Sequence, residues 1–171
     1  APVNTMSFPY LDETKELNES TRKEAAGSFI ALTDGVTHYE ISGDINNATV
    51  VMVHGFSTPY FIFDTTFEFL VNSGFRVLRY DLLGRGLSDR PNTSYSIELF
   101  VRQLKDLLDA LNLKGIHLMG LSMGGPITAA FIDKYPEYVY KHVLIDPAGA
   151  RPFTYPFLLT AVKIPWLGEL F

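Results

Sequence analysis

Four mainly apolar runs cross the middle of the chain, and they lack the regular alternation of polar and apolar residues that marks a half-exposed strand. The runs are Thr49–Val53, Phe75–Tyr80, Ile116–Met119 and Val139–Ile145. Runs of this kind are typical of strands that are buried on both faces, as in a parallel sheet. They therefore predict four strands of such a sheet.

Between these runs the apolar residues return every three or four positions, which is the period of a helix. This pattern predicts helices over Phe61–Val71, Ile97–Leu111 and Met123–Tyr135. Ser96 is a good N-cap for the second helix, and Pro136 stops the third. Strands that alternate with helices are typical of an α/β domain with a mostly parallel sheet and flanking helices.

A hairpin is expected ahead of the first apolar run. Ser28–Leu32 and Thr37–Ile41 are short alternating stretches, and Asp34-Gly35 lies between them. Asp-Gly readily adopts the positive φ of a tight turn, so the two stretches are expected to pair as antiparallel strands.

Composition divides the chain into three parts. Residues 1–26 are polar, and we expect an arm with a short helix through Glu13–Glu24. Residues 27–149 hold the strands and helices described above and are expected to form the core. Residues 150–171 are aromatic, apolar and broken by prolines, so they are expected to start an excursion away from the sheet.

The overall composition is that of one globular domain. The chain has 171 residues, 47% of them hydrophobic, and a net charge of -5. The acidic balance argues against a nucleic-acid partner, which normally meets a face rich in Lys and Arg. The absence of cysteine excludes disulfides, zinc sites with Cys ligands and a thiol nucleophile. No apolar run is long enough for a membrane-spanning helix.

Targeting signals give little information. The first ten residues have neither the basic nor the apolar region of a signal peptide. Glycosylation sequons at Asn18, Asn47 and Asn92 are interpreted as chance matches. A cytoplasmic location is favoured over secretion, although the sequence does not fix the compartment.

The most specific motif is Gly120-Leu-Ser-Met-Gly-Gly125, which follows a predicted strand and opens a predicted helix. A G-x-S-x-G turn at this place exposes a strained serine, here Ser122, as a nucleophile. Gly120 and Gly124 lack a Cβ and permit the sharp bend. The N–H of Met123, at the start of the helix, is a candidate donor to an oxyanion.

A second motif, His54-Gly55-Phe56, directly follows the first buried strand. The backbone N–H of Phe56 is the second candidate oxyanion donor, and Gly55 belongs to the loop that supports it. His54 is interpreted as a buried histidine that fixes this loop through hydrogen bonds, and not as the catalytic base.

The segment Asp81–Pro91 carries two glycines and is interpreted as a structural loop near the site. The side chains expected to hold it are Asp81, Arg85, Ser88 and Asp89. Its spacing does not match a dinucleotide fingerprint, and no phosphate-binding P-loop occurs. We therefore expect neither an organic cofactor nor a metal.

In this order and spacing the three motifs resemble the α/β-hydrolase fold over residues 28–150, closest to the branch of serine esterases, lipases and carbon–carbon bond hydrolases. The resemblance implies a mostly parallel sheet, a Ser–acid–His triad in that chain order, and a helical cap after the sixth strand. Residues 27–149 would then be the N-terminal part of the fold, and residues 150–171 the start of the cap or lid. Ser122, Phe56 and Met123 match the family's nucleophile and oxyanion donors.

The chain offers no evident partner for the serine. His142 lies at the start of the last predicted strand, and Ser122 lies just past the end of its own strand. In a parallel sheet these are opposite ends, so His142 is excluded as the base. His38 lies on the early hairpin and is not expected to be the base either. Asp146 follows the last strand and is a possible acid. We therefore expect the catalytic histidine outside this chain, in a further C-terminal part of the fold that belongs to the same protein or to a companion chain.

These residues predict a serine hydrolase that cleaves a carboxylic ester or related acyl bond through an acyl-enzyme at Ser122. The expected partner is a small ester with an apolar acyl part, contacted by Phe56, Tyr60, Phe61 and Tyr155. Three alternatives stay open: hydrolysis of a carbon–carbon bond in a dienoate, a perhydrolase activity, or a non-catalytic binding domain with the same fold.

Overall fold

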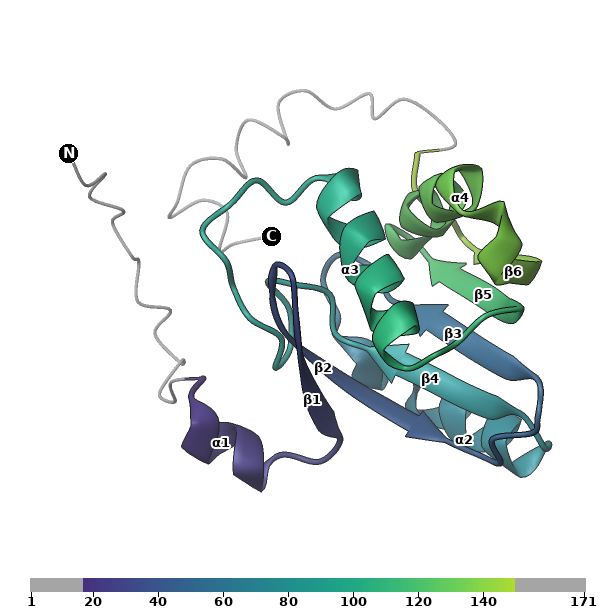
Figure 1. Ribbon diagram of the computed structural model, residues 1–171, viewed down its shortest axis with the longest axis horizontal. Helices are drawn as coiled ribbons and strands as arrows, with labels where there is room; N and C mark the ends of the chain where they lie inside the picture. The colour runs from purple at the N-terminus through teal and green to yellow at the C-terminus, as the bar shows by residue number, and fades with distance from the viewer. Residues whose placement is uncertain (1–16, 150–171) are drawn as a thin grey trace.

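A six-stranded sheet forms the centre of the part of the chain that the computed structural model describes, residues 17–149 (Figure 1). The order across the sheet is β1-β2-β4-β3-β5-β6. β1 and β2 form an antiparallel hairpin, β2 pairs antiparallel with β4, and the remaining neighbours are parallel. The strands are β1 Ser28–Leu32, β2 Gly35–Ser42, β3 Thr49–Val53, β4 Arg76–Tyr80, β5 Ile116–Leu121 and β6 Val139–Ile145.

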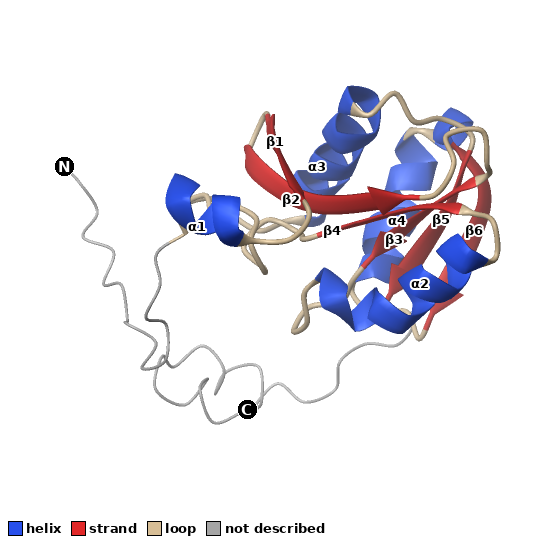
Figure 2. Cartoon of the chain, turned by 90° about the horizontal axis from the view of Figure 1, so that it is seen from below, coloured by secondary structure: helices blue, strands red, loops and turns tan. Residues whose placement is uncertain are grey.

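Helices cover both faces of this sheet. Figure 2 shows α3 and α4 on one side and α2 on the other. The α-helices are α1 Glu19–Glu24, α2 Asp64–Asn72, α3 Ile97–Ala110 and α4 Gly124–Lys134, and two 3-10 turns are η1 Tyr60–Phe63 and η2 Pro136–Tyr138. None of the helices in residues 17–149 combines the length and the apolar character needed to cross a bilayer.

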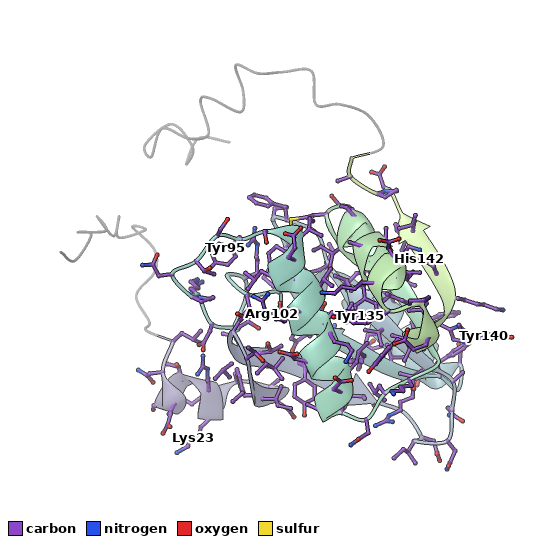
Figure 3. The ribbon with its side chains drawn as sticks, turned by 45° about the horizontal axis from the view of Figure 1, so that its top comes forward. Lys23, Tyr95, Arg102, Tyr135, Tyr140 and His142 are labelled. Atoms are coloured by element: carbon purple, nitrogen blue, oxygen red, sulfur yellow. The ribbon has the colours of Figure 1, made fainter. Side chains whose placement is uncertain are left out.

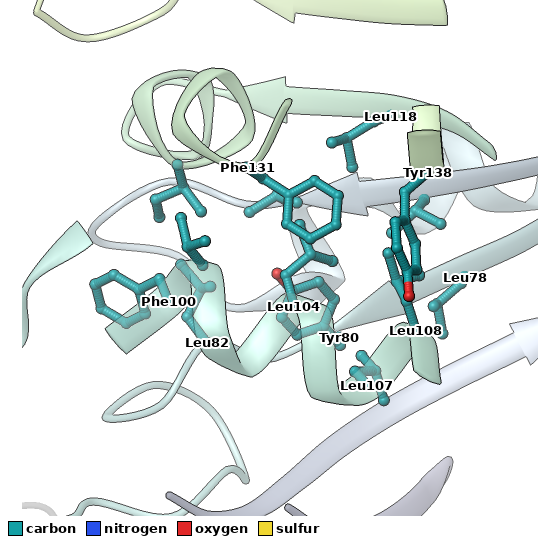
Figure 4. Close-up of a cluster of buried hydrophobic side chains, with 14 of the residues drawn as sticks. Leu78, Tyr80, Leu82, Phe100, Leu104, Leu107, Leu108, Leu118, Phe131 and Tyr138 are labelled. Atoms are coloured by element: carbon teal, nitrogen blue, oxygen red, sulfur yellow. The ribbon is translucent and has the colours of Figure 1, made fainter. Parts of the chain in front are cut away.

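The larger hydrophobic core lies between the sheet and the α3–α4 layer (Figure 4). Leu104, Leu107 and Leu108 of α3 are fully buried there against Leu118 and Phe131. Each such side chain contributes about 1.5–3 kcal/mol through burial. A smaller cluster under α2 contains Val50, Met52, Phe63, Phe67 and Val77. The inner strands are thus covered on both faces, as their continuous apolar runs predict.

The predicted sheet, hairpin and three helices are confirmed, with two local differences. The helix predicted from Phe61 begins as the 3-10 turn η1, in which the N–H of Asp64 donates to the carbonyl of Phe61. In the hairpin, Gly35 is not a turn residue but the first residue of β2, paired with Leu32. Its φ is +143°, and a Cβ added to Gly35 would lie 2.9 Å from Cβ of Asp89. Both facts explain why this position needs glycine.

The last strand, β6, forms the edge of the described sheet and is mostly exposed. Val143, Leu144 and Ile145 keep 43%, 47% and 39% of their surface exposed. The apolar open edge expected from the sequence is therefore present within residues 17–149. The predicted arm up to residue 16 and the predicted cap segment at residues 150–171 lie outside the described residues.

Candidate active site

Ser122 lies at the bend between β5 and α4, at the carboxyl edge of the parallel strands. Its φ is +50°, in the left-handed region that costs a non-glycine residue about 1–3 kcal/mol. Three backbone hydrogen bonds hold it there. Its N–H donates to the carbonyl of Ile145 at 3.0 Å, and its own carbonyl accepts from Gly125 and Ala148, each at 2.9 Å. Ser122 is half-buried, so its position at this bend leaves it open to solvent.

Close packing explains the two glycines that flank the serine. A Cβ on Gly120 would lie 2.5 Å from the Gly124 carbonyl oxygen and from Oγ1 of Thr128. A Cβ on Gly124 would collide with the carbonyl oxygen of Val53. Neither residue has a positive φ. The motif therefore needs glycine here because β3, β5 and α4 come together, and not because of the backbone angles.

The loop after β3 runs directly past the serine. Val53 of β3 is in register with Gly120 of β5, so both strands end at the same edge. A Cβ on Gly55 would be 3.1 Å from Cβ of Ser122 and 3.6 Å from its Oγ. Within residues 17–149 no protein acceptor is bonded to the N–H of Phe56 or of Met123. Both predicted donors are thus available beside the serine.

His54 is completely buried behind this loop. Its Nε2 accepts a hydrogen bond from the N–H of Leu82 at 2.9 Å, so Nδ1 carries the proton and donates to the carbonyl of Gly55 at 2.7 Å. Burial lowers the pKa of His54 below its ordinary value. The ring is therefore neutral, with a fixed tautomer, and it joins the loop after β3 to the end of β4.

The Asp81 loop is organised around a buried pair that the sequence analysis missed. Oδ2 of Asp81 faces Nδ1 of His38 at 2.8 Å, and it also accepts from the N–H of Leu87. Nε2 of His38 faces the carbonyl of Ala26 at 2.8 Å. The ring of His38 thus bridges a carboxylate oxygen and a backbone carbonyl, and it ties the Asp81 loop to the segment before β1. The early position of His38 in the chain gave no signal of this long-range contact.

The other side chains of this loop hold backbone groups, as their types suggested. Oγ of Ser88 donates to the carbonyl of Asp81 at 2.7 Å and accepts from the N–H of His38. The carboxylate of Asp89 accepts from the N–H of Val36 at 2.7 Å and pairs with Arg22. The loop is thereby fixed against the hairpin.

His142 and Asp146 lie on β6 and just after it. Nε2 of His142 is 2.8 Å from Oγ1 of Thr128, and Figure 3 shows His142 on the β6 side of the molecule together with Tyr140. Asp146 is exposed, with a φ of +41°. Within residues 17–149 neither side chain is hydrogen-bonded to Ser122. The structure therefore brings the nucleophile and oxyanion candidates together without a histidine.

The aromatic acyl pocket expected from the sequence is only partly formed by the described residues. Tyr60 and Phe61 line a cavity of about 440 Å³, but Asp64 and Arg79 line it as well. Phe56 is 65% exposed and does not line this cavity. Tyr155 lies outside the described residues. No cluster of three metal-ligating side chains forms within residues 17–149.

Comparisons with known proteins place the chain in a known fold family. The family model described as alpha/beta hydrolase fold matches residues 48–169. A 2-hydroxy-6-oxononadienedioate/2-hydroxy-6-oxononatrienedioate hydrolase of Pseudomonas putida is 38% identical over 143 residues, which are 78% of this chain and 50% of that enzyme. The chain thus spans about half the length of this curated relative.

Two solved structures resemble the chain in three dimensions. An esterase from Exiguobacterium antarcticum has a TM-score of 0.68 and 29% identity, over 72% of this chain and 46% of the esterase. A meta-cleavage product hydrolase from Pseudomonas fluorescens has a TM-score of 0.67 and 31% identity, over 73% of this chain and 46% of that chain.

Proposed function

Because the chain belongs to the α/β-hydrolase fold family, we propose that it carries the nucleophile of a serine hydrolase that cleaves a carboxylic ester or a related acyl bond. One observation supports this most: Ser122 is held in a left-handed bend beside Gly55, and within residues 17–149 the N–H groups of Phe56 and Met123 have no protein acceptor. A serine with amide donors beside it supplies two of the parts that acyl transfer needs.

In the proposed mechanism Oγ of Ser122 attacks the acyl carbonyl and forms a tetrahedral intermediate. The N–H groups of Phe56 and Met123 stabilise its oxyanion, and loss of one such donor typically lowers kcat about 10²- to 10³-fold. The intermediate collapses to an acyl-enzyme as the alcohol leaves, and water then releases the acid.

The mechanism requires a histidine to take the proton of Ser122, since a protonated serine is a poor nucleophile. Within residues 17–149 the rings of the four histidines contact other groups, and none is hydrogen-bonded to Ser122. We propose that the base comes from a further C-terminal part of the fold, in the same protein or in a companion chain. Asp146 follows the strand beside Ser122 and is the acid candidate within this chain.

A second candidate is hydrolysis of a carbon–carbon bond in a dienedioate. The Pseudomonas putida relative supports it, because its name describes a hydrolase of such compounds and it is 38% identical to this chain. Assays with p-nitrophenyl esters of increasing chain length, run beside assays with ring-cleavage dienoates, separate the two activities.

Labelling with a fluorophosphonate tests the nucleophile in the full-length protein. We expect one adduct, which Ser122→Ala removes and the control Ser73→Ala leaves in place, because Ser73 is exposed at the end of α2 and bonded to Phe69. If the folded wild-type protein takes no label and hydrolyses neither substrate class, the fold serves as a binding domain and the proposal is wrong.

A further inference from the structure

The side chain of Arg85 lies against the loop that carries the proposed oxyanion donor. Its Nε donates to the carbonyl of Phe56 at 3.2 Å, and its Cζ is 4.8 Å from the centre of the Phe56 ring. Nη1 is 3.4 Å from the carbonyl of Leu83. The rings of Tyr95 and Phe100 flank the guanidinium at 5.7 and 5.8 Å. The cation is thus half enclosed by aromatic rings and backbone carbonyls.

Among the described residues, Arg85 is half-buried without a counter-ion, unlike Arg79 and Arg102. Arg79 pairs with Glu40 and Asp64, and Arg102 pairs with Asp34. Within residues 17–149 no carboxylate forms an ion pair with Arg85. Burial, which no carboxylate offsets, lowers the pKa of this guanidinium below its ordinary value. A partly buried charge without a partner is costly unless an anion meets it.

The donors that remain free suit a carboxylate. A guanidinium has five N–H donors in a rigid fork, and the printed hydrogen bonds of Arg85 use Nε and Nη1. No protein acceptor within residues 17–149 is bonded to Nη2. The planar fork matches the two oxygens of a carboxylate, and such bidentate pairs are among the strong hydrogen bonds of proteins.

The free donors also lie near the reacting groups. Phe56, which Arg85 contacts, directly follows Gly55, and Gly55 touches Ser122. Two consecutive residues of the loop, Gly55 and Phe56, therefore connect the serine to the guanidinium.

We propose that Arg85 is a specificity residue that binds a carboxylate which the substrate carries at a distance from its scissile carbonyl. This inference rests on the proposed function, since it assumes that the acyl carbonyl meets Ser122. It names anionic acyl compounds, such as half-esters of dicarboxylic acids, as the substrate class. A merely structural Arg85, stacked on aromatic rings, would affect neutral and anionic substrates alike.

Two esters of equal acyl length test the proposal in the full-length protein: p-nitrophenyl valerate and p-nitrophenyl hydrogen glutarate. We expect Arg85→Gln to lower kcat/KM for the glutarate about 10- to 100-fold more than for the valerate, mainly through KM. Arg85→Lys keeps the charge without the planar fork. Its preference for the glutarate over the valerate is expected to lie between that of the wild type and that of Arg85→Gln. Arg102→Gln is the matched control, because it removes an equal charge from an exposed ion pair on α3 and leaves the ratio unchanged.

A binding experiment separates this inference from the proposed function. Glutarate is titrated calorimetrically into the Ser122→Ala protein, with and without Arg85→Gln, so that no turnover is needed. We expect the second substitution to weaken binding at least about tenfold. If glutarate binding depends on Arg85 but the wild-type protein hydrolyses no ester and takes no fluorophosphonate label, the proposed function fails and the carboxylate site stands. Equal losses for both esters, or glutarate binding that ignores Arg85, overturn the proposal.

Discussion

His54 shows how one buried side chain fixes the direction of the amide that we propose as an oxyanion donor. Its Nδ1–H holds the carbonyl of Gly55, and the peptide that contains this carbonyl also contains the N–H of Phe56. Because a peptide group is planar, fixing its oxygen fixes the direction of its N–H. The hydrogen bond from Leu82 to Nε2 keeps the ring in the tautomer that this requires.

Acid is expected to weaken the fold through His54. Its pKa is lowered in the folded protein from the ordinary value of 6.5, so the unfolded chain takes up a proton first as the pH falls. The contribution of the neutral His54 ring to the free energy of unfolding is complete above pH 6.5. It is lost as the pH falls from there toward the pKa of His54 in the folded protein. Urea unfolding at pH 7.5 and 5.5 measures this loss. His54→Gln, which does not titrate, should show a smaller difference between the two pH values, and an equal difference contradicts the assignment.

The clash at Gly124 predicts a large loss of stability in Gly124→Ala. The added Cβ meets the backbone oxygen of Val53, which cannot move without disturbing β3, so we expect a cost of about 3 kcal/mol or more. Gly74→Ala is the control, since nothing lies within 4 Å of its Cβ and only its φ of +85° is strained. That strain costs about 1–2 kcal/mol. Urea unfolding measures the stability that each variant loses. A larger loss in Gly74→Ala than in Gly124→Ala contradicts the packing argument.

At the residue scale the sequence predicted the contacts that follow from short motifs. The turn at Ser122 and the place of the loop His54-Gly55-Phe56 after β3 were predicted, because each motif directly follows a strand. The pairing of His38 with Asp81 and the contact of Arg85 with Phe56 were not predicted. Those contacts join residues that are 43 and 29 positions apart, and only the folded chain brings them together.

At the scale of elements, α3 depends on its first turn as well as on its buried face. Oγ of Ser96 accepts a hydrogen bond from the N–H of Leu99 at 3.4 Å, which satisfies a donor that has no partner within the helix. We expect Ser96→Ala to lower the free energy of unfolding by about 0.5–1 kcal/mol. Thermal or urea unfolding tests this, with Ser94→Ala as the control. A loss of equal size in both variants argues against a capping role.

Periodicity predicted the elements well where it was continuous. The apolar face of α3 and the runs of β3 and β6 gave the correct type and nearly the correct bounds. Burial explains this for α3 and β3, whereas the described part of β6 is mostly exposed and is held by its pairing with β5. It failed at Phe61, where the first turn is a 3-10 turn, since the hydrophobic period does not distinguish the two helix types over four residues. It also misplaced the hairpin turn by one residue, because Gly35 is required by its contact with Asp89.

At the scale of the whole molecule, β6 is the described element most prone to pair with another chain. It presents apolar side chains and unpaired backbone groups along an edge, a combination that favours pairing with other chains. An apolar cavity of about 270 Å³ opens beside it, lined by residues that include Val50, Leu118, Met119 and Val143. The sequence predicted this edge but not what covers it, since the proposed covering segment lies outside these residues.

We expect the 171-residue chain, expressed by itself, to self-associate through β6. Val143→Lys adds a charge to that edge and should raise the monomeric fraction measured by light scattering. Phe69→Lys is the matched control, because Phe69 is an exposed apolar residue on a helix, α2, and not on the edge strand. If both variants have the same effect, general surface hydrophobicity and not β6 causes the association.

The hydrogen bond from the N–H of Ser122 to the carbonyl of Ile145 connects the proposed nucleophile to this weakly covered strand. The carbonyl of Ser122 is held from the same side by Ala148, so two of its three backbone restraints come from the end of β6. When β6 detaches, the serine can relax into an ordinary conformation while the rest of the sheet remains intact. The rate at which a fluorophosphonate reacts with Ser122 would then report whether β6 is paired with β5. It would detect local detachment of this strand even where the circular dichroism of the protein does not change.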